Sequence, residues 1–134
     1  MTRLALGLAG AFLLAPAAFA QSAGDAAKGE KVFRKCAACH AVGEGAKNKV
    51  GPVLNGVVGR AAASTDYNYG KGIVAAREKG LVWTEEELMA YLVHPRNYLR
   101  KYLDDKKAKS KMSFKLKKEG QRADVIAYLK TLSE

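Results

Sequence analysis

Residues 36–40 read Cys36-Ala37-Ala38-Cys39-His40, so two cysteines three positions apart are followed at once by a histidine. On a helix, positions i, i+3 and i+4 share one face, and both sulfur atoms and the imidazole ring would point to the same side. This spacing is typical of covalent attachment of a c-type haem, with Cys36 and Cys39 forming thioethers to the haem vinyl groups. His40 would then stand beneath the iron as one axial ligand. We therefore expect one covalent haem c.

Two other kinds of site share part of this pattern. A structural disulfide or a thioredoxin-like redox pair also uses Cys-x-x-Cys, but the thioredoxin fold needs strands and a βαβ unit, which the hydropathy pattern does not predict. A zinc site would need Cys36, Cys39, His40 and His94, because these are the only cysteines and histidines in the chain. Neighbouring Cys39 and His40 side chains could not easily bind one tetrahedral ion. Haem attachment is the favoured interpretation.

The first 20 residues have the pattern of a cleaved secretory signal peptide. Arg3 provides a positive start, residues 4–15 form an apolar run, and Ala18-Phe19-Ala20 fits the small-residue rule for cleavage. A retained membrane anchor is the alternative, but the run is short for a span and is interrupted by Gly7, Gly10 and Pro16. We expect residues 21–134 to form a single exported domain, located in the periplasm and without stable membrane insertion.

The chain is basic, with a formal net charge of +10. The excess is concentrated between Arg100 and Lys118, a stretch with nine basic residues and only Asp104 and Asp105 as acids. A basic surface can bind nucleic acid, but these lysines lack the interleaved aromatic residues on which bases stack, and an exported location argues against that function. The charge instead favours docking on acidic protein surfaces.

The two ends of the exported domain are predicted to form helices that pack on each other. Asp25 is a good N-cap for a helix that continues to about His40. A second helix over about residues 118–132 has an apolar side made of Val125, Ile126, Tyr128, Leu129 and Leu132. Gly29 lies on the apolar stripe of the first helix, where the missing side chain would let another backbone approach closely. We expect the two helices to cross at Gly29.

The middle of the chain is predicted to hold one strongly marked helix. Thr84 and Glu87 have capping-box spacing, and Trp83 and Leu88 flank them as a hydrophobic staple. Pro95 should end this helix. Shorter helices are expected over residues 73–79 and 98–103, whereas the glycine-rich stretches at 43–56 and 61–72 are interpreted as loops. No alternating strand pattern is present, so the predicted fold is all-α, with about four to five short helices and loops around one haem.

The second axial ligand must come from elsewhere in the chain, and a methionine thioether is a common choice in electron carriers. Of the three methionines, Met1 belongs to the signal peptide and Met89 lies in the capped helix, where a packing role is expected. Met112 lies in a polar segment with little helical pattern, where iron ligation would account for an apolar side chain. His94 is the rival ligand, but it directly precedes a proline at a helix end. We expect Met112 to be the ligand.

Taken in order, these residues resemble those of the class I cytochromes c and, within them, the cytochrome c2 group of bacterial periplasmic carriers. The resemblance covers essentially all of residues 24–133. It rests on Gly29 with Phe33, the pentapeptide at 36–40, Gly51-Pro52-Val53-Leu54-Asn55-Gly56, Trp83, residues 88–92, Lys111-Met112-Ser113-Phe114 and residues 124–129. It implies the cytochrome c fold, with His40 and Met112 as the axial ligands of the haem iron.

The same resemblance implies roles for residues around the haem. The carbonyl of Pro52 would accept the Nδ1 proton of His40, and the hydroxyl of Tyr91 would point at the sulfur of Met112. Tyr69 and the indole of Trp83 would bond a buried haem propionate, with Arg60 near its charge. For Tyr69 and Trp83, ordinary aromatic packing is the alternative, and for Arg60 a solvated surface charge.

By resemblance, the protein is a monomeric one-electron carrier and not an enzyme. Its donor would be a quinol-oxidising cytochrome complex, and its acceptor a photosynthetic reaction centre or a terminal oxidase. A haem peroxidase or a gas-binding protein is the rival, and it would need an open iron position. The chain departs from mitochondrial relatives in a longer stretch between Tyr98 and Met112 and an expanded segment around Tyr67 to Lys79, which we interpret as features of a subtype.

Overall fold

The computed structural model describes residues 24–132, and the predicted signal peptide at 1–20 lies outside them. Within this range the chain forms five helices, which are α1 (Ala26–Phe33), α2 (Lys71–Glu78), α3 (Glu85–Val93), α4 (Pro95–Leu103) and α5 (Glu119–Lys130). The described residues contain no strand, only an isolated bridge between Ala61 and Val82. The predicted all-α fold is therefore confirmed. None of these helices is long and apolar enough to cross a membrane.

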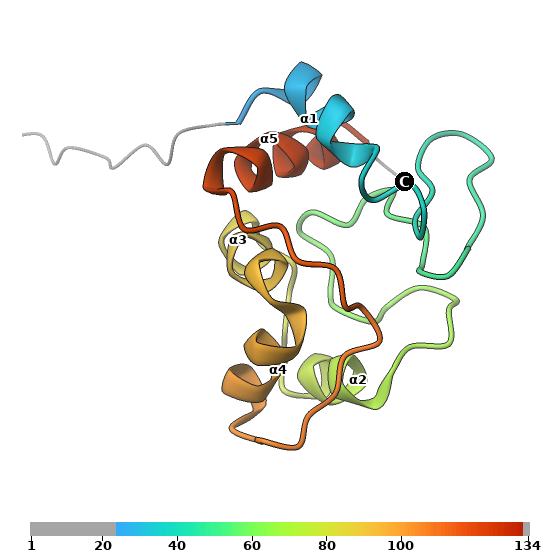
Figure 1. Ribbon diagram of the computed structural model, residues 1–134. Helices are drawn as coiled ribbons and strands as arrows, with labels where there is room; N and C mark the ends of the chain where they lie inside the picture. The colour runs from blue at the N-terminus through green and yellow to red at the C-terminus, as the bar shows by residue number, and fades with distance from the viewer. Residues whose placement is uncertain (1–23, 133–134) are drawn as a thin grey trace, which may run out of the picture.

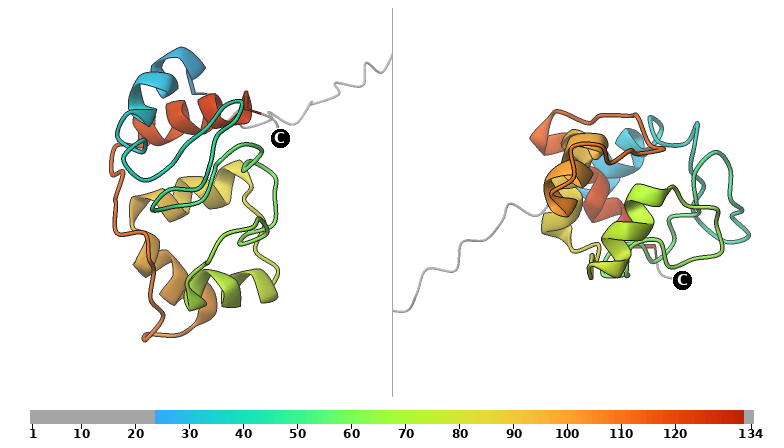
Figure 2. Two further views of the ribbon diagram at one scale, coloured as in Figure 1. Left: turned by 90° about the vertical axis from the view of Figure 1, so that its right-hand side faces the viewer. Right: turned by 90° about the horizontal axis from the view of Figure 1, so that it is seen from below.

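Helices α1 and α5 cross at one end of the molecule, as Figures 1 and 2 show. Gly29 lies so close to α5 that a Cβ atom added to it would come within 3.0 Å of the Asp124 carbonyl and of Tyr128 Cβ. Asp25 caps α1 by accepting a hydrogen bond from the Lys28 amide at 3.0 Å. Its own amide donates to the Asp124 carboxylate at 2.8 Å. The predicted crossing at Gly29 is confirmed, and it joins the two ends of the described chain.

The first helix is shorter than predicted. We expected it to continue to about His40, but α1 ends at Phe33. From there the backbone tightens, because the amides of Lys35 and Cys36 donate to carbonyls three residues back, at 3.0 and 2.7 Å. One α-type turn then forms over the haem motif, where the His40 amide donates to the Cys36 carbonyl at 2.9 Å. The motif is therefore held in a separate turn of its own.

Helix α3 ends at Val93, and α4 begins at Pro95, only two residues later. Thr84 caps α3 as predicted, accepting from the Glu87 amide at 3.1 Å. The second half of the capping box is absent, because the Glu87 carboxylate accepts a hydrogen bond from the Tyr98 hydroxyl of α4. His94 caps α4, with Nδ1 accepting from the Asn97 amide at 3.3 Å. Glu87 thus ties the two helices together.

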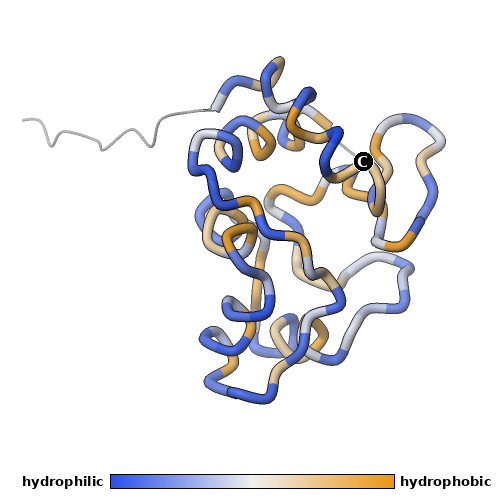
Figure 3. The backbone as a smooth tube through the Cα atoms, in the orientation of Figure 1, coloured by the Kyte–Doolittle hydropathy of each residue, from blue (hydrophilic) through white to orange (hydrophobic). Residues whose placement is uncertain are grey.

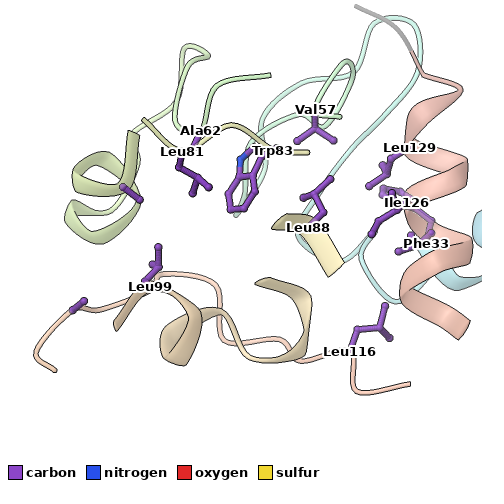
Figure 4. Packing of buried hydrophobic residues seen from close by; sticks show 13 residues of the cluster. Phe33, Val57, Ala62, Leu81, Trp83, Leu88, Leu99, Leu116, Ile126 and Leu129 are labelled. Carbon is purple, nitrogen blue, oxygen red and sulfur yellow. The ribbon is translucent and has the colours of Figure 1, made fainter. Parts of the chain in front are cut away.

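The buried side chains form two groups with Trp83 between them (Figure 4). One group lies against α5 and includes Phe33, Val57, Leu88, Ile126 and Leu129. The other lies near α2 and α4 and includes Ala62, Leu81 and Leu99. Four of the buried apolar residues are alanines, so these side chains fill little volume and the protein core is small.

Residues 104–118 run without helix from α4 back to α5, and Figure 3 shows that much of this segment is hydrophilic. It is fixed near both ends. A Cβ atom added to Gly72 in α2 would come within 3.0 Å of the Lys109 carbonyl, so α2 packs directly on this segment. Further along, the amide of buried Leu116 donates to the Leu92 carbonyl of α3 at 2.8 Å. Met112 lies between these two anchors.

The close crossing at Gly29 gives a stability prediction. Gly29→Ala should lower the free energy of unfolding by roughly 1–3 kcal/mol or more, because the added methyl group meets the α5 backbone and forces the helices apart. Gly120→Ala in α5 is the matched control, since no atom lies within 4 Å of the added Cβ. It should be neutral or stabilising by up to about 1 kcal/mol. Denaturant unfolding followed by haem absorbance measures both, and equal effects would show that the crossing tolerates a side chain.

Candidate functional site

The turn over residues 36–40 places three potential ligands together. Hydrogen bonds from the amides of Cys39 and His40 to the Cys36 carbonyl, at 3.0 and 2.9 Å, close the turn. Neither cysteine forms a disulfide; Cys36 is half-buried and Cys39 exposed. Burial raises the pKa of the Cys36 thiol, and the charge of Lys35 partly offsets that effect. Two free thiols and an imidazole are therefore available within one turn.

The imidazole of His40 is held in one orientation by the loop that follows. His40 Nδ1 lies 2.7 Å from the Pro52 carbonyl oxygen. Because a carbonyl only accepts, Nδ1 carries the proton and Nε2 keeps its lone pair. A Cβ atom added to Gly51 would lie within 3.0 Å of three atoms of this ring, so the ring packs directly on the glycine backbone. Gly51 and Pro52 together fix the ring with Nε2 free.

The charge state of His40 suits metal binding. Burial lowers the pKa of the imidazole below its ordinary value, and Lys49 lowers it further, while the hydrogen bond to Pro52 acts in the opposite direction. Burial therefore favours the neutral imidazole, which is the form that ligates a metal.

Met112 lies half-buried in the segment between α4 and α5. Its carbonyl accepts a hydrogen bond from the Ser110 hydroxyl at 2.8 Å. The rival side chains have other roles, because Met89 packs against the core from α3 and His94 caps α4. Met1 lies outside the described residues. Of Met89 and Met112, Met112 is therefore the one whose thioether is not packed in a helix.

Two of the predicted aromatic residues, Trp83 and Tyr91, pack in a row with Tyr98. The rings of Trp83 and Tyr91 are 4.7 Å apart, and those of Tyr91 and Tyr98 are 5.5 Å apart. Burial raises the pKa of Tyr91, and a hydrogen bond with Ser110 acts in the opposite direction. The Tyr91 hydroxyl thus contacts Ser110, two residues before Met112. Ser110 carried no role in the sequence analysis, since a serine in a polar segment gives no signal.

The remaining predicted residues lie in the loops. The Tyr69 hydroxyl is 2.5 Å from the Thr65 hydroxyl, and no hydrogen bond of the Trp83 indole is found among the residues described. Arg60 donates to the Asn55 carbonyl at 2.7 Å, so part of its guanidinium holds a loop. The glycine contact under His40 was also missed, because Gly51 resembles an ordinary turn glycine in sequence.

Comparison with known proteins decides the family. The sequence model that describes cytochrome c matches residues 26–133. The chain belongs to the cytochrome c family. It falls in the cytochrome c2 group, being 52% identical over 117 residues to cytochrome c2 iso-1 of Rhodospirillum centenum, with 82% of this chain and 98% of that one covered. It is 48% identical to cytochrome c2 of Rhodospirillum rubrum over 131 residues, which cover 94% of this chain and 97% of the relative.

Solved structures of a cytochrome c2 and of a cytochrome c-550 have the same fold. That of the Rhodospirillum centenum protein superposes with a TM-score of 0.79 at 49% identity, covering 83% of this chain and all of that one. That of ferric cytochrome c-550 from Paracoccus versutus gives a TM-score of 0.75 at 45% identity, covering 83% and 99%. This cytochrome c therefore carries one covalently attached haem c and transfers electrons; it is not an enzyme.

The residues present fit a haem c. Two free thiols stand in one turn with an imidazole whose Nε2 has no hydrogen bond within residues 24–132. A glycine under the imidazole leaves room for the ring in this orientation, and any larger residue would displace it. A methionine lies on a separate, anchored segment. Cysteine thiols form the covalent bonds to a c-type haem, and an imidazole with a methionine thioether is the ligand pair that cytochromes c use.

Proposed function

We propose that this cytochrome is a periplasmic one-electron carrier, in which Cys36 and Cys39 bind the haem through thioethers and His40 and Met112 ligate its iron. The observation that carries the proposal is the orientation of His40, whose Nδ1 is bonded to Pro52 while Nε2 is left for a metal, one turn from two free thiols. Residues 1–20 would direct export and then be removed.

The work of the protein is to keep the ligand set fixed during electron transfer. When bound, the haem supplies a one-electron couple between ferric and ferrous iron. Pro52 and Gly51 prevent rotation of the His40 ring, and a hydrogen bond to the other ring nitrogen of a ligating histidine fixes its orientation toward the metal. Ser110 and the anchor at Leu116 hold the backbone on either side of Met112. A haem site whose geometry is the same in both oxidation states has a small reorganisation energy for electron transfer.

Trp83 and Tyr69 are proposed to bond a haem propionate. The Trp83 side chain is largely buried, and its indole N–H has no partner among the described residues, so it can donate to an anionic group. The hydroxyls of Tyr69 and Thr65 share one hydrogen bond, in which one of them donates its proton to the other. The remaining hydroxyl proton can be donated to another acceptor.

Exposure of the reduced protein to carbon monoxide tests the proposed ligation. Iron that already has two protein ligands has no open position, so the absorption spectrum should not change. Rapid carbon monoxide binding by the native reduced protein would instead indicate an open coordination site and would overturn the assignment of Met112.

The proposed partners are membrane electron-transfer complexes, with a quinol-oxidising cytochrome complex as donor and a reaction centre or terminal oxidase as acceptor. The protein would meet them as a monomer through a basic surface. Lys35 lines a hollow of about 280 Å³ together with Phe114, Lys115, Leu116, Lys117, Lys118 and Gln121. Lysines from beside the haem motif and from the Met112 segment therefore gather at one place. Lys111, which also flanks Met112, does not line this hollow.

Salt and charge changes should alter the rate of electron transfer with a quinol–cytochrome c oxidoreductase. Steering by a basic patch weakens as the Debye length falls from about 10 Å at 0.1 M to about 3 Å at 1 M salt, and steering can raise association rates by ~10-fold or more. We expect the bimolecular rate constant to fall by at least about tenfold over that range. Stopped-flow kinetics measures this.

Single neutralisations locate the surface. Lys35→Gln and Lys117→Gln should each slow the reaction at low salt. Lys130→Gln is the matched control, because Lys130 pairs with Glu85 at 3.3 Å and does not line the hollow. Equal effects from all three variants, or a rate independent of salt, would argue against docking at this hollow and leave the haem chemistry unaffected.

A further inference from the structure

Lys111, the residue before Met112, makes contacts that a solvated surface lysine does not need. Its Nζ donates to the Asn68 carbonyl at 2.5 Å and lies 5.8 Å from the centre of the Tyr67 ring. Its aliphatic stem crosses the Gly70 backbone, where an added Cβ atom would come 3.1 Å from Lys111 Cγ. The whole side chain is therefore laid along residues 67–70.

Tyr67 continues this contact to the other side of the site. Its hydroxyl donates to the Val50 carbonyl, one residue before the Gly51 backbone on which the His40 ring packs. Asn48 makes a parallel link, donating to the Asp66 carbonyl at 2.6 Å and accepting from the Val53 amide at 3.0 Å. Residues 65–70 thus connect the loop that positions His40 with the segment that carries Met112.

Helix α2 and residues 67–70 contact the Met112 segment together. Gly72 of α2 packs on the Lys109 carbonyl, so α2 and residues 67–70 cover the Met112 segment from Lys109 to Lys111. On the far side of Met112, the first backbone anchor is at Leu116, which bonds Leu92. Lys111 is therefore the residue nearest to Met112 in the sequence whose side chain bonds this segment to another loop.

We propose that Lys111 and Tyr67 form a latch. It holds the Met112 segment against residues 67–70 and sets how readily the Met112 sulfur leaves the iron. The inference rests on the proposed ligation by Met112. Lys111 and Tyr67 act as positioning residues, since neither is assigned to the haem. If the latch opens, the segment keeps its anchors at Lys109 and Leu116 but the backbone at Met112 gains freedom, so an incoming ligand can displace the thioether more often.

Displacement of Met112 by imidazole in the ferric holoprotein tests the latch. Imidazole is a neutral ligand over much of the accessible pH range, so loss of one lysine charge has little effect on its approach. Lys111→Ala should raise the rate of imidazole binding by about tenfold, equivalent to about 1.4 kcal/mol. Lys111→Arg, which keeps a cation and its donors, should restore a rate near that of the wild type. Without imidazole, the sulfur-to-iron absorption band should persist in both.

Two further variants complete the design. Tyr67→Phe keeps the ring under Lys111 but removes the bond to Val50, and its rate should fall between those of the wild type and Lys111→Ala. Lys106→Ala removes an exposed lysine of the same segment and should leave the rate within about twofold of the wild type, which is under 0.5 kcal/mol. Denaturant unfolding of all variants separates a local effect on Met112 from a loss of global stability.

The outcomes separate the latch from the proposed function. If Lys111→Ala binds imidazole at the wild-type rate, or if Lys106→Ala accelerates it equally, the latch is wrong while ligation by Met112 stands. A wild-type rate in Tyr67→Phe would remove the link to Val50 from the proposal. If Met112→Ala itself keeps the sulfur-to-iron band, the proposed ligation has failed, and the latch has no ligand to hold.

Discussion

Cys39→Ala is expected to give a poor yield of holoprotein and, in its haem-free form, a chain with little fixed tertiary structure. The variant keeps one thiol, so the haem loses one of its two proposed covalent anchors. Without the haem, the turn at 36–40 and the Met112 segment lose their common centre. This should be the largest effect of any single substitution discussed, because it removes the cooperative folding transition itself.

The small size of the core explains why loss of the haem should remove the cooperative folding transition. Several of its buried apolar side chains are alanines, and the larger ones are divided between α5 and the region of α2 and α4. Small domains bury a modest fraction of their surface and have little stability to spare. A large flat apolar group packed against such a core would contribute a substantial part of the stabilising contacts.

Near-ultraviolet circular dichroism and thermal unfolding of the haem-free variant measure this effect, with mass spectrometry to report bound haem. Ala38→Ser is the control, since Ala38 is exposed between the two cysteines and the substitution leaves both thiols in place. It should bind haem and unfold cooperatively. An apoprotein of Cys39→Ala that shows a sharp unfolding transition would contradict the central place of haem in the core.

Met112→Ala is expected to abolish the sulfur-to-iron absorption band, open the iron to carbon monoxide and lower the reduction potential. A thioether ligand favours the reduced state, so its loss should shift the potential downward by more than about 60 mV, which is more than tenfold in the relative stability of the two oxidation states. Absorption spectroscopy and potentiometric titration measure these changes.

Met89→Ala and His94→Ala are the controls for this ligand. Met89 packs against the core from α3, and His94 caps α4 through Nδ1. Both substitutions should lower stability, with the loss of a helix cap worth about 1 kcal/mol, while the absorption band and the potential stay near their wild-type values. If either of them removed the band, the axial ligand would be that residue and not Met112.

Local signals in the sequence predicted much of the fold. The cap at Asp25, the cap at Thr84 and the boundary at Pro95 depend on residues only a few positions apart, and all three are found in the structure. The close approach at Gly29 was also predictable, because a glycine on the apolar stripe of a helix costs stability unless another backbone packs against it.

Choices between distant partners could not be predicted in this way. The Glu87 carboxylate could reach back to its own helix or forward to Tyr98, and only the packing of α4 decides in favour of Tyr98. The Tyr91 hydroxyl bonds Ser110, nineteen positions away in the chain, for the same reason. Lys111 bonds Asn68 across 43 positions. In each case the sequence shows a side chain able to bond, while the fold selects its partner.

The absorption spectrum of the purified ferric protein, recorded into the far red, tests the central claim most directly. We expect a covalently bound haem c in the low-spin state with a sulfur-to-iron charge-transfer band, which is the spectrum of iron with one imidazole and one thioether ligand. A high-spin spectrum, or a low-spin spectrum without the sulfur-to-iron band, would contradict ligation by Met112 and the carrier function built on it.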